Sequence, residues 1–384
     1  MDKVIESILC NGCHACYSIC PQRCISMIEN EEGFLEPKID KDKCLDCNLC
    51  VLNCPVNNNH TRNIEKELTS MVVINKNDEI REISSSGGVF AEIANYILEK
   101  NGSVYGAGFN QNFEVQHMRI IDKSKLYKLQ GSKYVQSKMG NIFLEVKKDL
   151  KENRFVLFTG TPCQVEGLKS FLGKEYDKLY TQDIICHGVP SPKAWKKYIE
   201  EFKGNIKSIS FRDKTLGWKR FSMKVETNNE KYINPLDKDI FLQSFLQNLN
   251  LRKSCYNCNC KKVNRQSDIT LADFWGIDKI DKKYYDDRGT SLVILQSEKG
   301  KDLYEQIKSK FIFSEVDLED AIKYNIAINN SVEMNKGRKR FFKNIDRYNY
   351  QKLFEISTKV TVIQRIINFM RKIKYKIGIK FKMV

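Results

Sequence analysis

One cysteine pattern occurs twice near the start of the chain and constrains the fold more than any other feature of the sequence. Its first copy is Cys10, Cys13, Cys16 and Cys20 followed by Pro21, and its second copy is Cys44, Cys47, Cys50 and Cys54 followed by Pro55. Three thiolates with this spacing can wrap a loop around one 4Fe-4S cluster. The fourth thiolate of each copy then reaches the other cluster.

The repeat predicts two clusters that exchange their fourth ligands. The first is assigned Cys10, Cys13, Cys16 and Cys54, and the second Cys44, Cys47, Cys50 and Cys20. Soft, anionic thiolates suit iron–sulfur cores. Zinc or unpaired thiols are the alternatives, but zinc sites rarely use this spacing even once. Cys24 is expected to be a small buried apolar residue. Residues 25–28 and 33–36 predict a hairpin between the copies, and residues 1–60 resemble a bacterial two-cluster ferredoxin.

The number of cysteines also helps to predict the cellular compartment of the protein. Fourteen cysteines would suggest disulfides in a secreted chain, but metal or redox chemistry in a reducing cytoplasm. The first residues lack the basic and then apolar pattern of an export signal, and no apolar run approaches the ~20 residues of a membrane-spanning helix. The chain has 384 residues, 41% of them hydrophobic and 29% charged, which predicts a folded cytoplasmic protein of two or three domains.

Positive charge is concentrated at the C-terminal end. The chain carries +16, and residues 331–384 contain 15 Lys or Arg against 3 Asp or Glu. A basic tail behind a nearly neutral body argues against a protein that binds nucleic acid over its whole surface. Basic residues near Phe341 and Phe342 leave a nucleic-acid-binding tail as an alternative, but no binding module is recognisable, and we expect no nucleic-acid partner.

The end of this tail has a second possible role. On a helix, one face would carry Ile363, Ile366, Ile367, Met370, Ile373 and Ile377, with Arg365, Arg371, Lys372, Lys374 and Lys376 mostly elsewhere. A basic amphipathic helix can lie on an anionic membrane, so peripheral contact with the inner face of a membrane is predicted. A packed or solvated terminal helix is the alternative.

The body of the chain alternates between strand and helix patterns. Strands are predicted over residues 71–74, 104–109, 154–158 and 179–186, and helices over 89–98, from 162 to about 172, and over 240–251. Alternation over residues 206–233 predicts antiparallel strands. This is α/β patterning, with functional loops at the strand ends.

A second thiol group lies in the body. Its members are Cys163, Cys186, Cys255, Cys258 and Cys260. Cys163 and Cys186 each follow a predicted strand, so neighbouring parallel strands would bring them together. Four thiolates suffice for a third cluster, assigned to Cys163, Cys186, Cys255 and Cys258 with Cys260 as the spare. Zinc and buried free cysteines are the alternatives, and the choice between Cys258 and Cys260 stays open. His187 is a candidate ligand or proton donor, or a structural hydrogen-bonding residue.

Two loops have phosphate-binding or cation-bearing composition. Residues 84–88, Ser-Ser-Ser-Gly-Gly, open a predicted helix, where hydroxyls and free N–H groups suit a phosphate. An ordinary helix cap is the alternative. Residues 131–136, Gly-Ser-Lys-Tyr-Val-Gln, add a cation and an aromatic ring, or form a simple exposed loop.

Together these motifs resemble one known family over residues 65–330. The order is Ser-Ser-Gly-Gly at 85–88, Gly-Ser-Lys-Tyr at 131–134, Gly-Thr-Pro-Cys-Gln at 160–164, Cys-His-Gly at 186–188, Phe-Arg-Asp-Lys at 211–214, Gly217-Trp218, the pair Cys255 and Cys258, and Ser-Asp-Ile-Thr-Leu-Ala-Asp-Phe-Trp-Gly at 267–276. The combination resembles the coenzyme F420 hydrogenase/dehydrogenase beta subunit family.

The resemblance implies an FAD, one 4Fe-4S cluster and hydride exchange with coenzyme F420 or another reduced carrier. Carried over by position, the cluster cysteines are Cys163, Cys186, Cys255 and Cys258, and the flavin region is Ser85, Ser86, Gly87, Gly88, Ser132, Lys133, Tyr134, Gln136 and Thr161. Lys133 could stabilise negative charge on a reduced flavin, and with His187 it is a candidate catalytic residue.

The predicted fold class is α+β, with a ferredoxin-like two-cluster domain followed by an α/β flavin and iron–sulfur domain. The predicted domains are 1–60, 65–330 and a basic, partly amphipathic helical tail over 331–384. The predicted function is that of an iron–sulfur flavoprotein oxidoreductase, which passes electrons between a hydride carrier at FAD and one-electron acceptors. Its partner is a redox protein or a small hydride donor or acceptor. The alternative is a non-catalytic ferredoxin-type electron-transfer adaptor, with surface-polysaccharide biosynthesis as a setting.

Overall fold

The computed structural model describes residues 9–57 and 67–359. The strands are β1 Ile25–Glu29, β2 Leu35–Ile39, β3 Thr69–Asn75, β4 Ser103–Phe109, β5 Val115–Ile120, β6 Val156–Gly160, β7 Leu179–Ile184, β8 Ile206–Asp213, β9 Ser222–Thr227, β10 Lys231–Pro235, β11 Ile269–Asp273, β12 Ser291–Leu295 and β13 Phe311–Glu315. The helices are α1 Ala15–Ile19, α2 Leu49–Leu52, α3 Asp78–Ile83, α4 Val89–Glu99, α5 Ile142–Lys151, α6 Pro162–Leu172, α7 Pro192–Ile199, α8 Ile240–Leu246, α9 Ile277–Ile280, α10 Glu298–Ile307, α11 Leu318–Ile322, α12 Arg338–Lys343 and α13 Tyr350–Thr358. None of the helices described is long and apolar enough to cross a membrane.

An eight-stranded mixed sheet forms the centre of the molecule. Its strand order is β13-β3-β12-β11-β7-β6-β4-β5. The inner strands β4, β6, β7 and β11 run parallel, while β5, β12 and β13 are antiparallel to their neighbours. The parallel run brings the carboxyl ends of β6 and β7 to one edge of the sheet, where loops of α/β proteins carry their functional residues.

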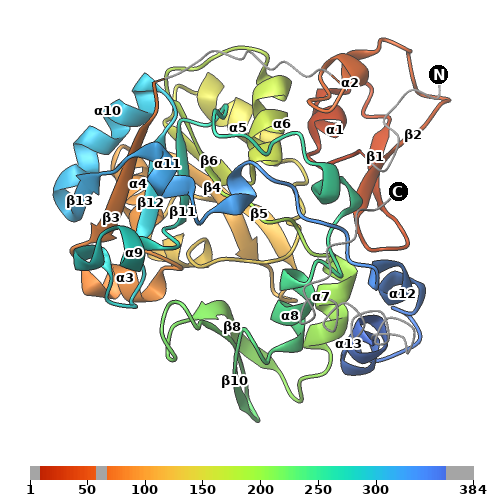
Figure 1. Cartoon of the computed structure of the whole chain (residues 1–384). Helices are drawn as coiled ribbons and strands as arrows, with labels where there is room; N and C mark the ends of the chain where they lie inside the picture. The colour runs from red at the N-terminus through yellow and green to blue at the C-terminus, as the bar shows by residue number, and fades with distance from the viewer. Residues whose placement is uncertain (1–8, 58–66, 360–384) are drawn as a thin grey trace, which may run out of the picture.

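Helices cover both faces of this sheet, because successive side chains of a strand point to opposite sides. Val104 and Leu157 pack with α4 and α10 on one face. Their neighbours Tyr105 and Phe158 pack with α5 and α6 on the other face. The result is a layered α/β body next to a small N-terminal domain (Figure 1), which agrees with the fold class expected from the sequence.

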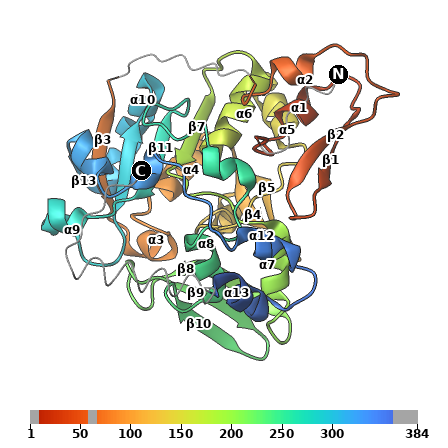
Figure 2. The same ribbon diagram turned by 45° about the vertical axis from the view of Figure 1, so that its right-hand side comes forward.

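The N-terminal domain is built around the predicted hairpin. β1 pairs with β2 in antiparallel register from Ile25 with Ile39 to Glu29 with Leu35. Short helices α1 and α2 follow the two cysteine loops, and α1 packs on α5 and α6 of the body. Figures 1 and 2 show this red domain beside α5 and α6 at one end of the molecule.

Strands β8, β9 and β10 form a three-stranded antiparallel sheet, which confirms the antiparallel strands expected over residues 206–233. A second apolar core lies beneath this sheet. Trp195 of α7 and Phe241 of α8 are fully buried in it. Phe341 of α12 and Tyr350 of α13 belong to the same core. Residues 338–358, from the segment expected to be a tail, therefore pack against the body, while the predicted amphipathic stretch 363–377 lies outside the described residues.

The helix predicted over residues 240–251 is shorter than expected. It ends at Leu246, and Asn248 adopts a left-handed conformation with φ of 60°. Asparagine tolerates this conformation better than most residues and therefore commonly ends a helix. The N–H of Leu249 then bonds the carbonyl of Ser244 at 2.9 Å, which turns the chain toward the last cysteines.

A buried carboxylate ties α5 to the sheet and provides a test of the fold. Asp149 is 3% exposed and accepts hydrogen bonds from Ser103 Oγ at 2.6 Å and Tyr105 Oη at 2.7 Å. Arg119 donates to both Asp149 oxygens at 2.7 Å. Removing one partner of a buried ion pair leaves the others without a counter-charge.

We therefore expect Asp149→Ala to lower the free energy of unfolding by about 3–5 kcal/mol. The measurement is anaerobic denaturant unfolding followed by circular dichroism. Glu145→Ala, on the exposed side of α5, is the matched control and should change stability by less than about 0.5 kcal/mol. Equal stability of the two variants would contradict this role of Asp149.

Candidate functional site

The structure brings together the four cysteines assigned to the first ferredoxin cluster. Burial raises the pKa of Cys13 to about 12, and the neighbouring Cys10 and Cys54 add to this rise. Cys16 is surrounded by the same three thiols, and its pKa is also raised, mainly by burial. A metal ligand must be a thiolate, so these buried sulfurs need the positive charge of a metal centre to ionise near neutral pH.

The second ferredoxin group lines a separate pocket. Its cysteines are Cys20, Cys24, Cys44, Cys47 and Cys50. Cys47 is exposed, whereas Cys24 is buried with its sulfur 3.4 Å from that of Cys20. The position of Cys24 agrees with the expected small buried residue, although it also lies in the wall of this site.

The two loops are alike in backbone as well as in sequence. Gly12 and Asp46 occupy the same place in the two copies, and both have left-handed conformations with φ of 65° and 53°. His14 and Asn48 form a second equivalent pair, with φ of 68° and 57°. Left-handed residues are uncommon outside glycine. Their recurrence at matched positions winds each loop so that its three cysteines face one space.

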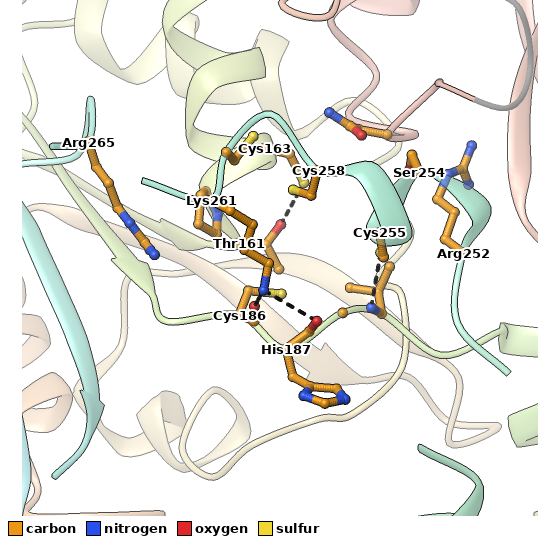
Figure 3. A pocket seen from close by; sticks show the side chains of 15 residues that line it. Thr161, Cys163, Cys186, His187, Arg252, Ser254, Cys255, Cys258, Lys261 and Arg265 are labelled. Atoms are coloured by element: carbon orange, nitrogen blue, oxygen red, sulfur yellow. Dashed lines mark hydrogen bonds between the residues drawn. The ribbon is translucent and has the colours of Figure 1, made fainter. Parts of the chain in front are cut away.

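The third group of cysteines lines a pocket in the body. The pocket is bordered by Cys163, Cys186, Cys255, Cys258 and Cys260, together with Asn11, Thr161, His187, Arg252, Lys261 and Arg265 (Figure 3). Cys163 follows β6 and Cys186 follows β7, and these strands are parallel neighbours. The predicted meeting of these two cysteines at one sheet edge is therefore seen in the structure.

The turn before α6 holds Cys163 in the first turn of that helix. Thr161 and Gln164 form a reciprocal capping box, and Pro162 occupies the first helical position. Such a cap satisfies N–H groups that would otherwise lack partners. The Thr161 hydroxyl also lies 3.1 Å from the Cys163 sulfur. Thr161, expected to be in the flavin region, therefore contacts the third thiol group.

Three cationic side chains, Arg252, Lys261 and Arg265, border this pocket. The Lys261 ammonium donates to the carbonyls of Cys186 and His187, as Figure 3 shows, and to that of Ala327 at 3.0 Å. Burial raises the pKa of Cys255 to about 12, whereas the neighbouring Cys260 side chain lowers the pKa of Cys258. Cys255 and Cys258 therefore lie in different electrostatic surroundings on the wall of the same pocket.

Thiol geometry differs from that of a compact ion site. Across residues 9–57 and 67–359, no three or more His, Cys, Asp or Glu side chains are grouped as the ligands of a single metal ion. The cysteines of the third group border a space instead. His187 turns its ring away from them (Figure 3), with Nε2 2.7 Å from Asn248 Oδ1. This places His187 in a structural hydrogen bond.

The two loops expected to hold a flavin meet each other. Ser132 donates from its N–H and its hydroxyl to Ser85 Oγ, at 2.7 and 2.9 Å. Ser86 Oγ donates to the Thr290 carbonyl at 2.7 Å. Gly87 packs so closely on the sheet that a Cβ there would lie 2.4 Å from the Val73 carbonyl oxygen. Gly87 is therefore explained by packing.

Aromatic and cationic groups surround this loop junction. Tyr134 stacks on Phe245, with ring centroids 4.7 Å apart. Arg212, 5% exposed, donates to the Ser85 carbonyl at 3.2 Å and to Asp273 at 2.8 Å. The Nε atom of Arg212 is buried without a hydrogen-bond partner. An unpaired buried donor is costly, so this atom suits a polar group of a bound ligand.

Gln136 lies apart from the other flavin candidates. Its Nε2 donates to the Asn11 carbonyl of the ferredoxin domain at 3.0 Å, and its Oε1 accepts from Arg252 at 2.9 Å. Arg252 and Lys261 are pocket residues that the sequence did not predict. Their only signal was their position beside the cysteine pair at 255 and 258.

Two parts of the chain match known protein families. Residues 9–58 match the 4Fe-4S dicluster domain, and residues 153–321 match the family described as the C terminus of the coenzyme F420 hydrogenase/dehydrogenase beta subunit. The chain thus carries an N-terminal domain of the kind that holds two 4Fe-4S clusters. Residues 153–321 are similar to the C terminus of the beta subunit of an oxidoreductase family, the coenzyme F420 hydrogenases and dehydrogenases. The loops at 84–88 and 131–136 lie outside the matched range.

The individual proteins similar to this chain have low sequence identity to it or cover only a short part of it. Pyruvate synthase subunit PorD of Methanocaldococcus jannaschii is 39% identical over 54 residues, which are 14% of this chain and 58% of that protein. Structural maintenance of chromosomes protein 4 of Homo sapiens is 24% identical over 217 residues, 52% of this chain but 17% of that protein. A chain of the F420-reducing NiFe hydrogenase complex from Methanosarcina barkeri is 15% identical with a TM-score of 0.46, covering 75% of this chain and 89% of that one.

Close contact between α6 and the first ferredoxin loop gives a test of the site. A Cβ on Gly167 would lie 2.8 Å from Cys13 Cβ and 2.9 Å from its sulfur. We expect Gly167→Ala to displace Cys13 and to cost about four irons per chain, the content of one cluster. The measurement is iron and sulfide analysis after anaerobic purification.

Ser170→Ala is the control for this variant. Ser170 lies on the same helix and donates to the Asn53 carbonyl at 2.7 Å, so its removal loses a contact with the ferredoxin domain without adding an atom. We expect its iron content to equal that of the wild type. Full iron content in Gly167→Ala would contradict the predicted displacement.

The buried amine of Lys133 should make the stability of the folded protein depend on pH. Its ammonium donates to the carbonyls of Gln130 at 2.7 Å and Lys128 at 3.0 Å, and burial lowers its pKa to about 7. The unfolded lysine has a pKa near 10.4. Between about pH 7 and 10 the unfolded chain therefore binds more protons at this residue, and its contribution to stability rises with pH.

We expect the apparent melting temperature of the wild type to rise relative to that of Lys133→Met as the pH is raised from 7 to 10. The measurement is anaerobic thermal unfolding at a series of pH values. Lys138→Met, which replaces an exposed lysine of the same segment, should show a constant difference from the wild type. A constant difference for Lys133→Met would show that its amine is not held in this way.

Proposed function

We propose that the protein is an iron–sulfur flavoprotein oxidoreductase that passes electrons between a hydride carrier and a one-electron redox partner. The observation that carries this proposal is the placement of α6 between two thiol groups. Cys163 lies in the first turn of this helix and lines the body pocket, while Gly167, one turn later, contacts Cys13 of the ferredoxin domain. Adjacent one-electron centres connected through one helix would suit an electron relay.

The third cluster is proposed at Cys163, Cys186, Cys255 and Cys258. Cys163 interacts electrostatically with the other three. Cys260 is 2% exposed, and its thiol donates to Glu166 Oε2 at 3.2 Å, so it already has a partner outside the pocket centre. This contact supports Cys258 over Cys260 as the fourth ligand. Lys261 holds the carbonyls of Cys186 and His187 and so fixes the orientation of the loop after β7.

FAD is proposed at the junction of the two loops, where Ser85, Ser132, Lys133 and Tyr134 would hold it. Bound there, the flavin would supply the exchange of a two-electron hydride for single electrons. The unpaired Nε of Arg212 supports a ligand at this junction. Arg212 lies against Phe221 and Trp275, at 4.0 and 5.4 Å from their ring centroids, which keeps its guanidinium in place.

A second candidate is a ferredoxin-type adaptor without a flavin. The mutual hydrogen bonds of Ser85 and Ser132 favour it, because these hydroxyls already have partners. Such an adaptor would keep its clusters but bind no FAD. The two candidates therefore differ in one measurable quantity, the flavin content of the intact chain.

The remaining assignments follow from the proposed chemistry. The partner is a redox protein or a small hydride donor or acceptor, with coenzyme F420 as one candidate carrier. The proposed location is the cytoplasm, with contact to the inner membrane face through the C-terminal basic residues. The proposed division of the chain into residues 1–60, 65–330 and 331–384 describes segments of the sequence rather than separately folded domains. Residues 338–358 of the third segment pack in the core of the body.

The decisive experiment is anaerobic purification followed by assays of iron, sulfide and flavin. Three clusters predict about twelve irons per chain, and the oxidoreductase predicts about one FAD, whereas the adaptor predicts none. Reduction by reduced coenzyme F420, by NADH or NADPH and by reduced ferredoxin is then compared. A colourless preparation that holds zinc or no metal would overturn both candidates.

Two cysteine variants test the third cluster separately. We expect Cys258→Ala to contain about four irons fewer than the wild type, because one of four ligands is lost. Cys260→Ala, the matched control from the same loop, should retain full iron. Electron paramagnetic resonance of the reduced proteins should show loss of one cluster signal in Cys258→Ala alone. The reverse pattern would assign Cys260 as the ligand instead.

A further inference from the structure

Arg252 occupies the junction between the ferredoxin domain and the body pocket. Arg252 follows α8 in the chain and precedes the cysteine pair at 255 and 258, and only 2% of its surface is exposed. Buried arginines are rare unless their donors are satisfied. All three nitrogens of its guanidinium have acceptors, which come from separate parts of the chain.

Two of these acceptors belong to the ferredoxin domain. Arg252 Nε donates to the carbonyl of Cys10 at 2.6 Å, and Nη2 donates to the carbonyl of Leu35 on β2 at 3.1 Å. Nη1 donates to Gln136 Oε1 at 2.9 Å, and Gln136 itself bonds the Asn11 carbonyl. The guanidinium thus holds the first cysteine loop directly and through Gln136.

Close packing fixes the same contact. Gly12, between Cys10 and Cys13, has a φ of 65°, and a Cβ there would lie 2.7 Å from Gln136 Nε2 and 3.0 Å from Arg252 Nη1. The glycine therefore lets the loop approach both side chains. A larger residue would separate the loop from the guanidinium.

The backbone of Arg252 belongs to the body pocket. Its N–H bonds the Val189 carbonyl at 3.0 Å, and its own carbonyl accepts from the N–H of Cys255 at 3.0 Å. Asn11 of the ferredoxin loop and Cys255 line one pocket, and Figure 3 shows Arg252 beside Ser254 and Cys255. A single residue therefore connects a ligand loop of each site by hydrogen bonds.

We propose that Arg252 is a positioning residue for electron exchange between the first ferredoxin cluster and the third cluster, and that its charge raises the reduction potential of the ferredoxin cluster. The third cluster in this statement rests on the proposed function. The exchange is a one-electron step in which one cluster is oxidised and the other reduced, and no bond forms or breaks. Arg252 holds the distance and orientation of the two ligand loops.

The charge argument follows from its surroundings. Apart from Glu36, whose Oε1 is 4.0 Å from Nη2, the groups bonded to the guanidinium are neutral carbonyl and amide oxygens. The Phe34 ring lies 5.3 Å from the guanidinium carbon. A buried, incompletely neutralised cation stabilises added negative charge nearby, and reduction adds an electron to a cluster that thiolates already make anionic.

The test uses the full chain, purified anaerobically, with two substitutions of Arg252. Arg252→Gln removes the charge, and Arg252→Lys keeps the charge but loses the fork that reaches three acceptors. The control is Glu32→Gln, which removes the ion pairs of Glu32 with Arg338, at 2.5 Å, and with Lys253, at 3.7 Å, but leaves every acceptor of the Arg252 guanidinium in place. The readouts are iron content, cluster potentials from electron paramagnetic resonance, and the rate of cluster reduction in stopped flow.

We expect all variants to keep the iron content of the wild type. Arg252→Gln should lower the potential of the ferredoxin cluster held by Cys10, Cys13, Cys16 and Cys54, whereas Arg252→Lys should keep it closer to that of the wild type. Both should slow electron exchange by about 10- to 100-fold, the usual cost of losing a residue that orients a metal ligand. Glu32→Gln should change neither quantity.

Two results would overturn the role of Arg252. One is an unchanged potential and rate in Arg252→Gln, and the other is an equal change in Glu32→Gln, which would indicate general loosening of the domain. Should Arg252→Gln not fold, the rate in Arg252→Lys decides the positioning role. If the wild type held about eight irons, the third cluster of the proposed function would be wrong. The potential of the ferredoxin cluster would still decide the effect of the Arg252 charge.

Discussion

The burial of cysteine sulfur is the constraint on which the rest of the structure depends. A thiolate inside a protein is unfavourable without a nearby positive charge, and burial raises the pKa of Cys13 and of Cys255 to about 12. The chain must therefore gather its thiols around spaces that a metal centre can fill. Parallel strands do this at the third group, and paired left-handed residues do it in the two ferredoxin loops.

Much of this arrangement could be predicted because its causes are local. The cysteine repeat defines its own loops, the hairpin after Cys24 needs only alternation and a turn, and β6 and β7 follow from short apolar runs. Placing Cys163 and Cys186 at one sheet edge then required only the assumption that neighbouring strands are parallel. The helix predicted over residues 240–251 was too long, because the left-handed turn at Asn248 has no distinct local pattern.

Contacts between distant segments could not be predicted in the same way. Gln136 was expected to be near a flavin but bonds Asn11 and Arg252, more than one hundred residues away on either side. The segment after residue 330 was expected to be a basic tail, yet Phe341 and Tyr350 complete a buried core with Trp195. In both cases the sequence shows the residue type, while its partner is set by the docking of whole elements.

The ion pair between Glu32 and Arg338 has a consequence for the order of assembly. Glu32 lies in the hairpin of the first domain, and Arg338 is 306 residues further along the chain. Domains fold largely as units during synthesis, beginning at the N-terminus. The ferredoxin domain therefore leaves the ribosome long before this anchor exists. Its clusters can be inserted while the domain is still accessible, and final attachment to the body then follows translation of the last core helices.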